Sequence, residues 1–210
     1  MNKPCENGVV PLLLATHCRL VSGRALLRNK RSPMCHNVRP CRDQVLDQIH
    51  CQVARLNMSA EELFEVYLKH QGHPFCHKEL DRFCPPDQTF PSFDNKTSEE
   101  KDRLVSLYKI FIYFNTSLGN ITRDQKVFGK DREEVLRQLS NTTNTTRGLL
   151  SNLTCLLCSK YKVKHVDVVY SNSSSTDKFL QKKQGCEELR RYKKVISQAA
   201  VSMGNCRRQL

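Results

Sequence analysis

The cysteines are the residues of this chain whose spacing could do chemistry. Cys155 and Cys158 form a C-x-x-C motif, and Cys35 and Cys41 lie far upstream. Such a set could be a redox pair, a four-cysteine zinc site or a pair of structural disulfides. The C-x-x-C motif falls at the C-terminal end of a predicted helix, where the helix dipole disfavours a thiolate. We therefore interpret these four residues as structural disulfides.

Other catalytic patterns are absent from the sequence. His165 and Asp167 could be read as an acid–base pair, but they lie in a predicted surface loop that includes a candidate short strand, VDVVY. The sequence has no H-E-x-x-H, G-x-S-x-G, P-loop or dinucleotide-binding motif. We predict that the protein is not an enzyme and that it uses neither a metal nor a cofactor.

Asparagine and cysteine usage indicates a secreted glycoprotein. Eleven cysteines among 210 residues favour an oxidising compartment. The apolar run GVVPLLLA, preceded by a lysine, is typical of a signal peptide, which we predict over residues 1–23. Chance would give roughly two Asn-x-Ser/Thr sequons in this composition. The chain has eight, which are the predicted glycosylation sites: Asn57, Asn95, Asn115, Asn120, Asn141, Asn144, Asn152 and Asn172.

The formal net charge of +13 favours a polyanionic partner. Outside the cell, that partner would be a glycosaminoglycan such as heparan sulfate rather than a nucleic acid, since the sequence has no nucleic-acid-binding motif. A basic glycosaminoglycan-binding extracellular protein is thus an alternative interpretation of the whole chain. The basic stretch RNKR, residues 28–31, is either a furin-type processing site or a solvated run of charge.

Four long stretches with apolar residues at alternating steps of three and four predict an all-α protein. We expect one domain over residues 24–210, with helices at about residues 43–70, 98–119, 131–160 and 177–203. The middle of the third, SNTTNTT, has low helix propensity.

The lengths of the links predict the topology. The links at about residues 71–96 and 161–176 are long enough to run the length of the bundle, whereas roughly a dozen residues between the second and third helices suit a turn. Long, short and long links predict an up-up-down-down four-helix bundle, the connectivity of the long-chain cytokines. This topology brings Cys35 and Cys41 to the same end as Cys155 and Cys158.

The last predicted helix carries an aromatic residue away from its apolar stripe. At about 100° per residue, Phe179 lies roughly 130° from the stripe that contains Leu189 and Tyr192. Lys182 follows one turn later, beside the ring. Either a covering loop buries the ring, or the ring is exposed next to a cation, which is a composition typical of an interface hot spot.

Several stretches resemble the interleukin-6 cytokine family. They are GVVPLLL, SLGNITRDQK, RGLLSN, LCSKY and HVDV, at residues 8–14, 117–126, 147–152, 157–161 and 165–168. The resemblance implies a secreted, monomeric four-helix cytokine that bridges two receptors and activates JAK-STAT signalling. It also implies three disulfides: Cys35–Cys158, Cys41–Cys155 and Cys84–Cys186.

The same resemblance implies two receptor-binding surfaces. Family members that bind the leukemia inhibitory factor receptor carry a Phe-x-x-Lys motif at the start of the fourth helix, which here is Phe179 and Lys182. A second surface, on the first and third helices, would bind the signal-transducing receptor that the family shares. Its residues here would be Gln48, Arg55, Gly148 and Asn152.

Three cysteines depart from the family pattern. Cys51 stands on the second surface, where a small polar residue is expected, and Cys76 and Cys206 are additional. Cys5 and Cys18 fall in the predicted signal peptide, which leaves nine of the eleven in the mature chain. If Cys76 pairs with one of the other two additional cysteines, one thiol is left free or bonds between molecules. Asn152 also lies in a sequon, and a glycan there would obstruct the second surface unless the disulfide at nearby Cys155 prevents its addition.

Overall fold

The computed structural model describes residues 34–35, 41, 43–75, 77–86, 93, 99–129, 131–168, 175–204 and 206. All of them belong to the second of two units, Met1–Arg31 and Ser32–Leu210. The predicted signal peptide, the RNKR stretch, Asn95, Asn172 and Cys76 lie outside the described residues.

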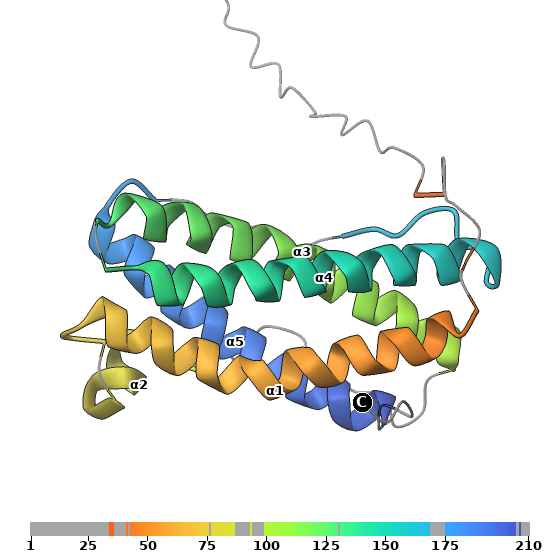
Figure 1. The fold of residues 1–210 in the computed structure, drawn as a ribbon, viewed down its shortest axis with the longest axis horizontal. Helices are drawn as coiled ribbons and strands as arrows, with labels where there is room; N and C mark the ends of the chain where they lie inside the picture. The colour runs from red at the N-terminus through yellow and green to blue at the C-terminus, as the bar shows by residue number, and fades with distance from the viewer. Residues whose placement is uncertain are drawn as a thin grey trace, which may run out of the picture. The chain divides into compact units, whose positions relative to one another are not determined.

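Four long helices pack against one another (Figure 1). They are α1 (Val45–Gln71), α3 (Glu100–Val127), α4 (Glu133–Ser159) and α5 (Lys178–Met203), and the first link adds η1 (His77–Glu79) and α2 (Leu80–Phe83). The all-α prediction is confirmed. The candidate strand was wrong over residues 166–168, which are irregular. None of the helices in the described part of the chain is long and apolar enough to span a membrane.

Helix α3 is longer than the sequence pattern predicted. We expected an end near residue 119, whereas the helix continues to Val127. Ile121 and Gln125 extend its buried stripe, and the Gln125 side chain accepts a hydrogen bond from Gln71 of α1 (Nε2–Oε1 3.0 Å). The link to α4 is therefore only residues 128–132, where Gly129 takes a left-handed conformation with φ of 107°.

Contacts between helix ends establish an up-up-down-down topology. The Cys41–Cys155 disulfide joins the start of α1 to the end of α4. Tyr67, near the end of α1, donates a hydrogen bond to the carbonyl of Lys182 at the start of α5 (2.9 Å). The hydrogen bond between the Gln71 and Gln125 side chains joins the ends of α1 and α3. Helices α1 and α3 therefore run in one direction, and α4 and α5 in the other.

The middle of α4 is helical despite its low intrinsic propensity. Thr142, Thr143 and Thr146 are buried there, and Leu139 and Leu149 anchor the flanking turns in the core. Tertiary burial of one face commonly outweighs weak propensity. The buried Oγ1 atoms of Thr143 and Thr146 have no hydrogen-bond partner among the described residues, so the buried face of this segment is stabilised by packing.

The start of α5 is fixed against the end of α1 by one tight contact. The Asp177 side chain caps α5 by accepting a hydrogen bond from the Leu180 N–H (2.8 Å). Two turns later, the fully buried Tyr67 ring lies against Gly185, where a Cβ atom would come within 2.2 Å of the Tyr67 hydroxyl oxygen. Burial raises the pKa of Tyr67 well above its usual value, so the hydroxyl remains a donor.

We expect Gly185→Ala to destabilise the protein by about 1–3 kcal/mol, because the added methyl group must displace the Tyr67 ring in a packed core. Denaturant unfolding followed by circular dichroism would measure this change. Gly119→Ala is the matched control, since a Cβ at Gly119, inside α3, meets nothing within 4 Å. It should stabilise the helix by about 0.5–1 kcal/mol. Equal effects of the two substitutions would contradict a steric role for Gly185.

Candidate functional site

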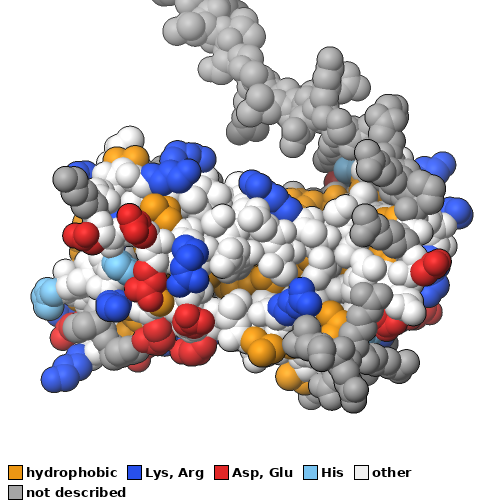
Figure 2. Space-filling view, in the orientation of Figure 1, with side chains coloured by type: hydrophobic (Ala, Val, Ile, Leu, Met, Phe, Trp, Pro, Cys, Tyr) orange, Lys and Arg blue, Asp and Glu red, His pale blue; other side chains and the backbone are white. Residues whose placement is uncertain are grey.

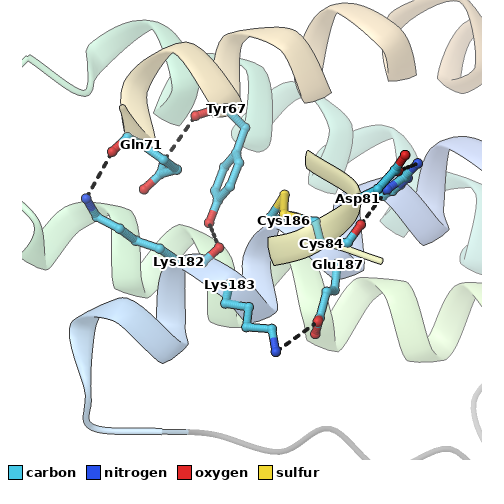
Figure 3. Close-up of a disulfide and its surroundings, with 9 residues drawn as sticks. Tyr67, Gln71, Asp81, Cys84, Lys182, Lys183, Cys186 and Glu187 are labelled. Atoms are coloured by element: carbon cyan, nitrogen blue, oxygen red, sulfur yellow. Dashed lines mark hydrogen bonds and ion pairs between the residues drawn. A yellow bond between two sulfur atoms is a disulfide. The ribbon is translucent and has the colours of Figure 1, made fainter. Parts of the chain in front are cut away.

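Phe179 lies in the first turn of α5 and is 43% exposed. Its inner side packs on Phe75 and Phe83 of the first link, with ring centroids 5.5 and 6.1 Å away. Phe83 is the last residue of α2, and the next residue, Cys84, is bonded to Cys186 of α5 (Figure 3). The ring is therefore partly buried and partly exposed, because the described residues of the link support one side of it and leave the other side open.

Lys182 reaches across to the end of α1. Its Nζ donates a hydrogen bond to the Gln71 carbonyl oxygen (3.1 Å), where a cation is favoured at a helix C-terminus (Figure 3). The same Nζ lies 5.9 Å from the centroid of the Phe128 ring. Partial burial, and then the charge of Arg132, lower the pKa of Lys182. The ammonium group is thus held in place, and it keeps further N–H donors for a partner.

Further apolar side chains are exposed around this motif. Leu180 is 45% exposed beside Phe179, and Val127 is 66% exposed at the end of α3, next to the Phe128 ring. We call Phe179, Leu180 and Lys182 the α5 surface. The supporting residues Phe75, Phe83 and Phe128 were missed by sequence reasoning. In the sequence, these residues are marked only as aromatic side chains close to Pro74 and Cys84 in the first link and at the end of α3.

The residues predicted for the second surface lie along the contact between α1 and α4. Asn152 donates from Nδ2 to the Gln52 side chain (3.0 Å) and, at 3.4 Å, to the Gln48 side chain. Gly148 lies one turn before Asn152, and a Cβ there would come 2.9 Å from the Nε2 of Gln52. Asn152 therefore bonds to both glutamines of α1, and Gln52, which sequence reasoning missed, also lies against Gly148.

Arg55 lies two turns along α1 from Gln48 and is exposed. It lines an open polar cavity of about 300 Å³ with Glu62 of α1 and with Arg137, Asn141 and Thr145 of α4. Figure 2 shows this side of the helices, where uncharged atoms fill most of the middle. We call Gln48, Arg55, Gly148 and Asn152 the α1–α4 surface.

Cys51 does not present a free side chain on the α1–α4 surface. It is 9% exposed and forms a disulfide with Cys206, beyond the end of α5. The pairing of Cys76 with Cys51 or Cys206, which the sequence left open, therefore does not occur, because these two cysteines bond to each other. Because residues three and four apart are neighbours on a helix, the bond attaches the chain after α5 next to Gln48 and Arg55.

The described residues form four disulfides, and three of them are the pairs that the resemblance implies: Cys35–Cys158, Cys41–Cys155 and Cys84–Cys186. The two cysteines of the C-x-x-C motif thus bond separately to the segment before α1. Their sequence separations of 123 and 114 residues correspond to about 4–5 kcal/mol each in the chain-entropy model. His165 and Asp167 pair with each other (2.9 Å) on an exposed segment.

The sequence model of the LIF / OSM family matches residues 44–203. The match spans all four long helices and ends at the last residue of α5. The α5 surface and the α1–α4 surface both lie inside it, whereas Cys206 lies outside it.

We expect Asn152 to carry no glycan in the folded protein, because its Nδ2 is bonded to Gln52 between two helices and a sugar there would separate them. Asn144, on the same helix, is exposed and serves as the control. Intact-mass measurement of protein secreted from mammalian cells should show loss of a glycan in Asn144→Gln and no loss in Asn152→Gln. A glycopeptide that contains modified Asn152 would show that this expectation is wrong.

Proposed function

Since the chain belongs to the LIF / OSM family, we propose that it is a secreted cytokine that bridges two receptors. One is the leukemia inhibitory factor receptor, and the other is the signal-transducing receptor shared by the interleukin-6 family. Bridging would bring the cytoplasmic JAK kinases of the two receptors together and activate STAT signalling. The LIF / OSM family is a signalling family rather than an enzymatic one, and the disulfides of the described residues are typical of an extracellular protein.

Within the family, we propose the leukemia inhibitory factor type rather than oncostatin M. The stretch SLGNITRDQK, residues 117–126, supports this assignment by its resemblance. Two of its residues are also buried polar groups that join helices. Ser117 donates to Glu188 of α5 (3.0 Å), and Gln125 accepts from Gln71 of α1. These hydrogen bonds between helices hold the Ser117 and Gln125 side chains in place.

The observation that carries the proposal is the exposed but supported ring of Phe179. An aromatic side chain that is already held in place loses little conformational entropy on binding, which is the property of a hot-spot anchor. We propose that Phe179 packs on the immunoglobulin-like region of the leukemia inhibitory factor receptor. Lys182, fixed beside it, would donate a hydrogen bond to the same receptor.

The α1–α4 surface is proposed to bind the shared receptor. Gly148 has no side chain, so a receptor backbone could approach α4 closely at this point. Gln48 and Asn152 supply amide groups around it, and the hydrogen bonds that Asn152 donates to Gln48 and Gln52 limit the rotamers that binding would have to fix. Uncharged polar groups avoid the desolvation cost of buried charge at the centre of an interface.

The separation of the two surfaces allows both receptors to bind at once. Gln48 lies near the start of α1, and Gln71, which holds Lys182, is its last residue. At 1.5 Å per residue, 23 residues of helix separate these points by about 35 Å. We therefore propose that a single molecule holds one receptor at each end of α1.

Alanine substitution of both Phe179 and Lys182 should weaken binding to the leukemia inhibitory factor receptor ectodomain by about thirtyfold or more, since hot-spot truncations cost about 2 kcal/mol or more each. Surface plasmon resonance with the secreted protein would measure the loss. The matched control is Lys178→Ala with Val201→Ala, which removes an exposed lysine and an exposed aliphatic residue from the same helix. Circular dichroism should show unchanged helical content in both variants. If the Phe179 and Lys182 variant still bound tightly, the receptor-binding site would lie on another part of the protein.

Gly148→Gln should weaken binding to the shared receptor at least tenfold, because a bulky side chain would occupy the space of close approach. Binding to the leukemia inhibitory factor receptor should stay unchanged, since the α5 surface lies at the other end of α1. The added Cβ meets only the flexible end of Gln52, so the fold should tolerate it. Ser140→Gln, an exposed position on the same helix, is the control. Equal loss for both receptors would point to a folding defect instead.

A further inference from the structure

The chain that follows α4 carries lysines at every second position, Lys160, Lys162 and Lys164. All three side chains are exposed, whereas the intervening Tyr161 and Val163 are partly buried and pack against the core. Three exposed lysines therefore fall within five residues at the end of α4, between side chains that pack against the core.

This segment is fixed rather than loosely attached. The Val163 N–H donates to the Leu157 carbonyl of α4 (2.9 Å), which folds the chain back onto the helix end. The sulfur of Cys35, in the Cys35–Cys158 disulfide, lies 3.0 Å from the Val163 carbonyl oxygen. The backbone between the two lysines is thus held at both the N–H and the carbonyl oxygen of Val163.

Lys162 occupies a backbone conformation that suits glycine. Its φ is 54°, in the left-handed region that lysine rarely adopts. Glycine is the common choice for such a residue just after a helix. The backbone of a non-glycine residue in this conformation is strained, and strained positions with exposed side chains are candidates for function.

Neighbouring acidic groups leave the charges of two lysines uncompensated. Glu100 accepts hydrogen bonds from Lys160 and Tyr161, which lower its pKa. Asp167 pairs with His165. Among the described residues, no acidic side chain pairs with Lys162 or Lys164. The two lysines therefore present free positive charge from a rigid support.

We propose that Lys160, Lys162 and Lys164 form a binding site for sulfated glycosaminoglycans. A sulfated linear polymer matches a cluster of uncompensated lysines on a fixed backbone, and the net charge of +13 attracts such a polyanion at long range. The site lies at the end of α4, beside the start of α1, whereas the α5 surface lies at the other end of α1. A glycosaminoglycan could therefore hold the protein in the matrix without blocking the α5 surface.

The test uses heparin-affinity chromatography and heparin binding near physiological ionic strength, with the full-length secreted protein. The variant is Lys162→Gly with Lys164→Ser. Glycine suits the left-handed conformation, so its unfolding temperature should equal or exceed that of the wild type. Its elution should shift to lower NaCl, and its heparin affinity should fall by about threefold to tenfold, since exposed charge contacts are individually weak.

The control variant is Lys126→Ser with Lys194→Ser, which removes the same charge from exposed positions on α3 and α5. It should keep nearly the wild-type affinity for heparin. An equal loss in both variants would show that net charge alone binds heparin and would overturn the site. Failure of the wild type to bind, or equal binding to desulfated heparin, would also overturn it. Binding of the Lys162 and Lys164 variant to the leukemia inhibitory factor receptor should be unchanged, which separates this proposal from the receptor proposal.

Discussion

The contact of Tyr67 with Gly185 is the constraint on which the α5 surface depends. The phenol ring fills the space that a side chain at Gly185 would take, so α1 and α5 approach more closely there than any other residue would allow. The hydroxyl then donates to the Lys182 carbonyl, and the Lys182 ammonium group returns to the Gln71 carbonyl. These two hydrogen bonds fix how the first turns of α5 are rotated about the helix axis relative to α1. The outward direction of the Phe179 ring follows from that rotation.

Disulfides hold the other parts of the scaffold that the two surfaces need. Cys84–Cys186 ties the first link to α5, which keeps the aromatic support beneath Phe179. At the opposite end, the segment before α1 is bonded twice to the last turn of α4. These two disulfides fix the position of α1 against α4. The amide groups of the α1–α4 surface, which lie at this contact, are thereby held in place. Both surfaces are therefore formed before any partner binds.

Local sequence patterns specified most of the fold, because helix periodicity records which face is buried. The apolar stripes placed α1, α4 and α5 to within about two residues of their observed ends. The same reasoning predicted too early an end for α3, because one of its last buried positions is a glutamine, which does not continue an apolar stripe. Gln125 can be buried because Gln71 donates to its side chain, and that partner comes from another helix. The candidate strand after α4 also failed over residues 166–168, since the described part of the chain offers no strand with which they could pair.

The sequence by itself determined that Phe179 lies off the apolar stripe, that the helices form an up-up-down-down bundle, and which cysteines could meet at each end. Tertiary structure alone decided what lies beneath Phe179, because Phe75 and Phe83 are about a hundred residues away in the chain. It also decided that Cys51 bonds to Cys206. Periodicity is a local property of a helix, whereas the partner of an aromatic ring or a thiol depends on the path of the connecting chain, which no local pattern encodes.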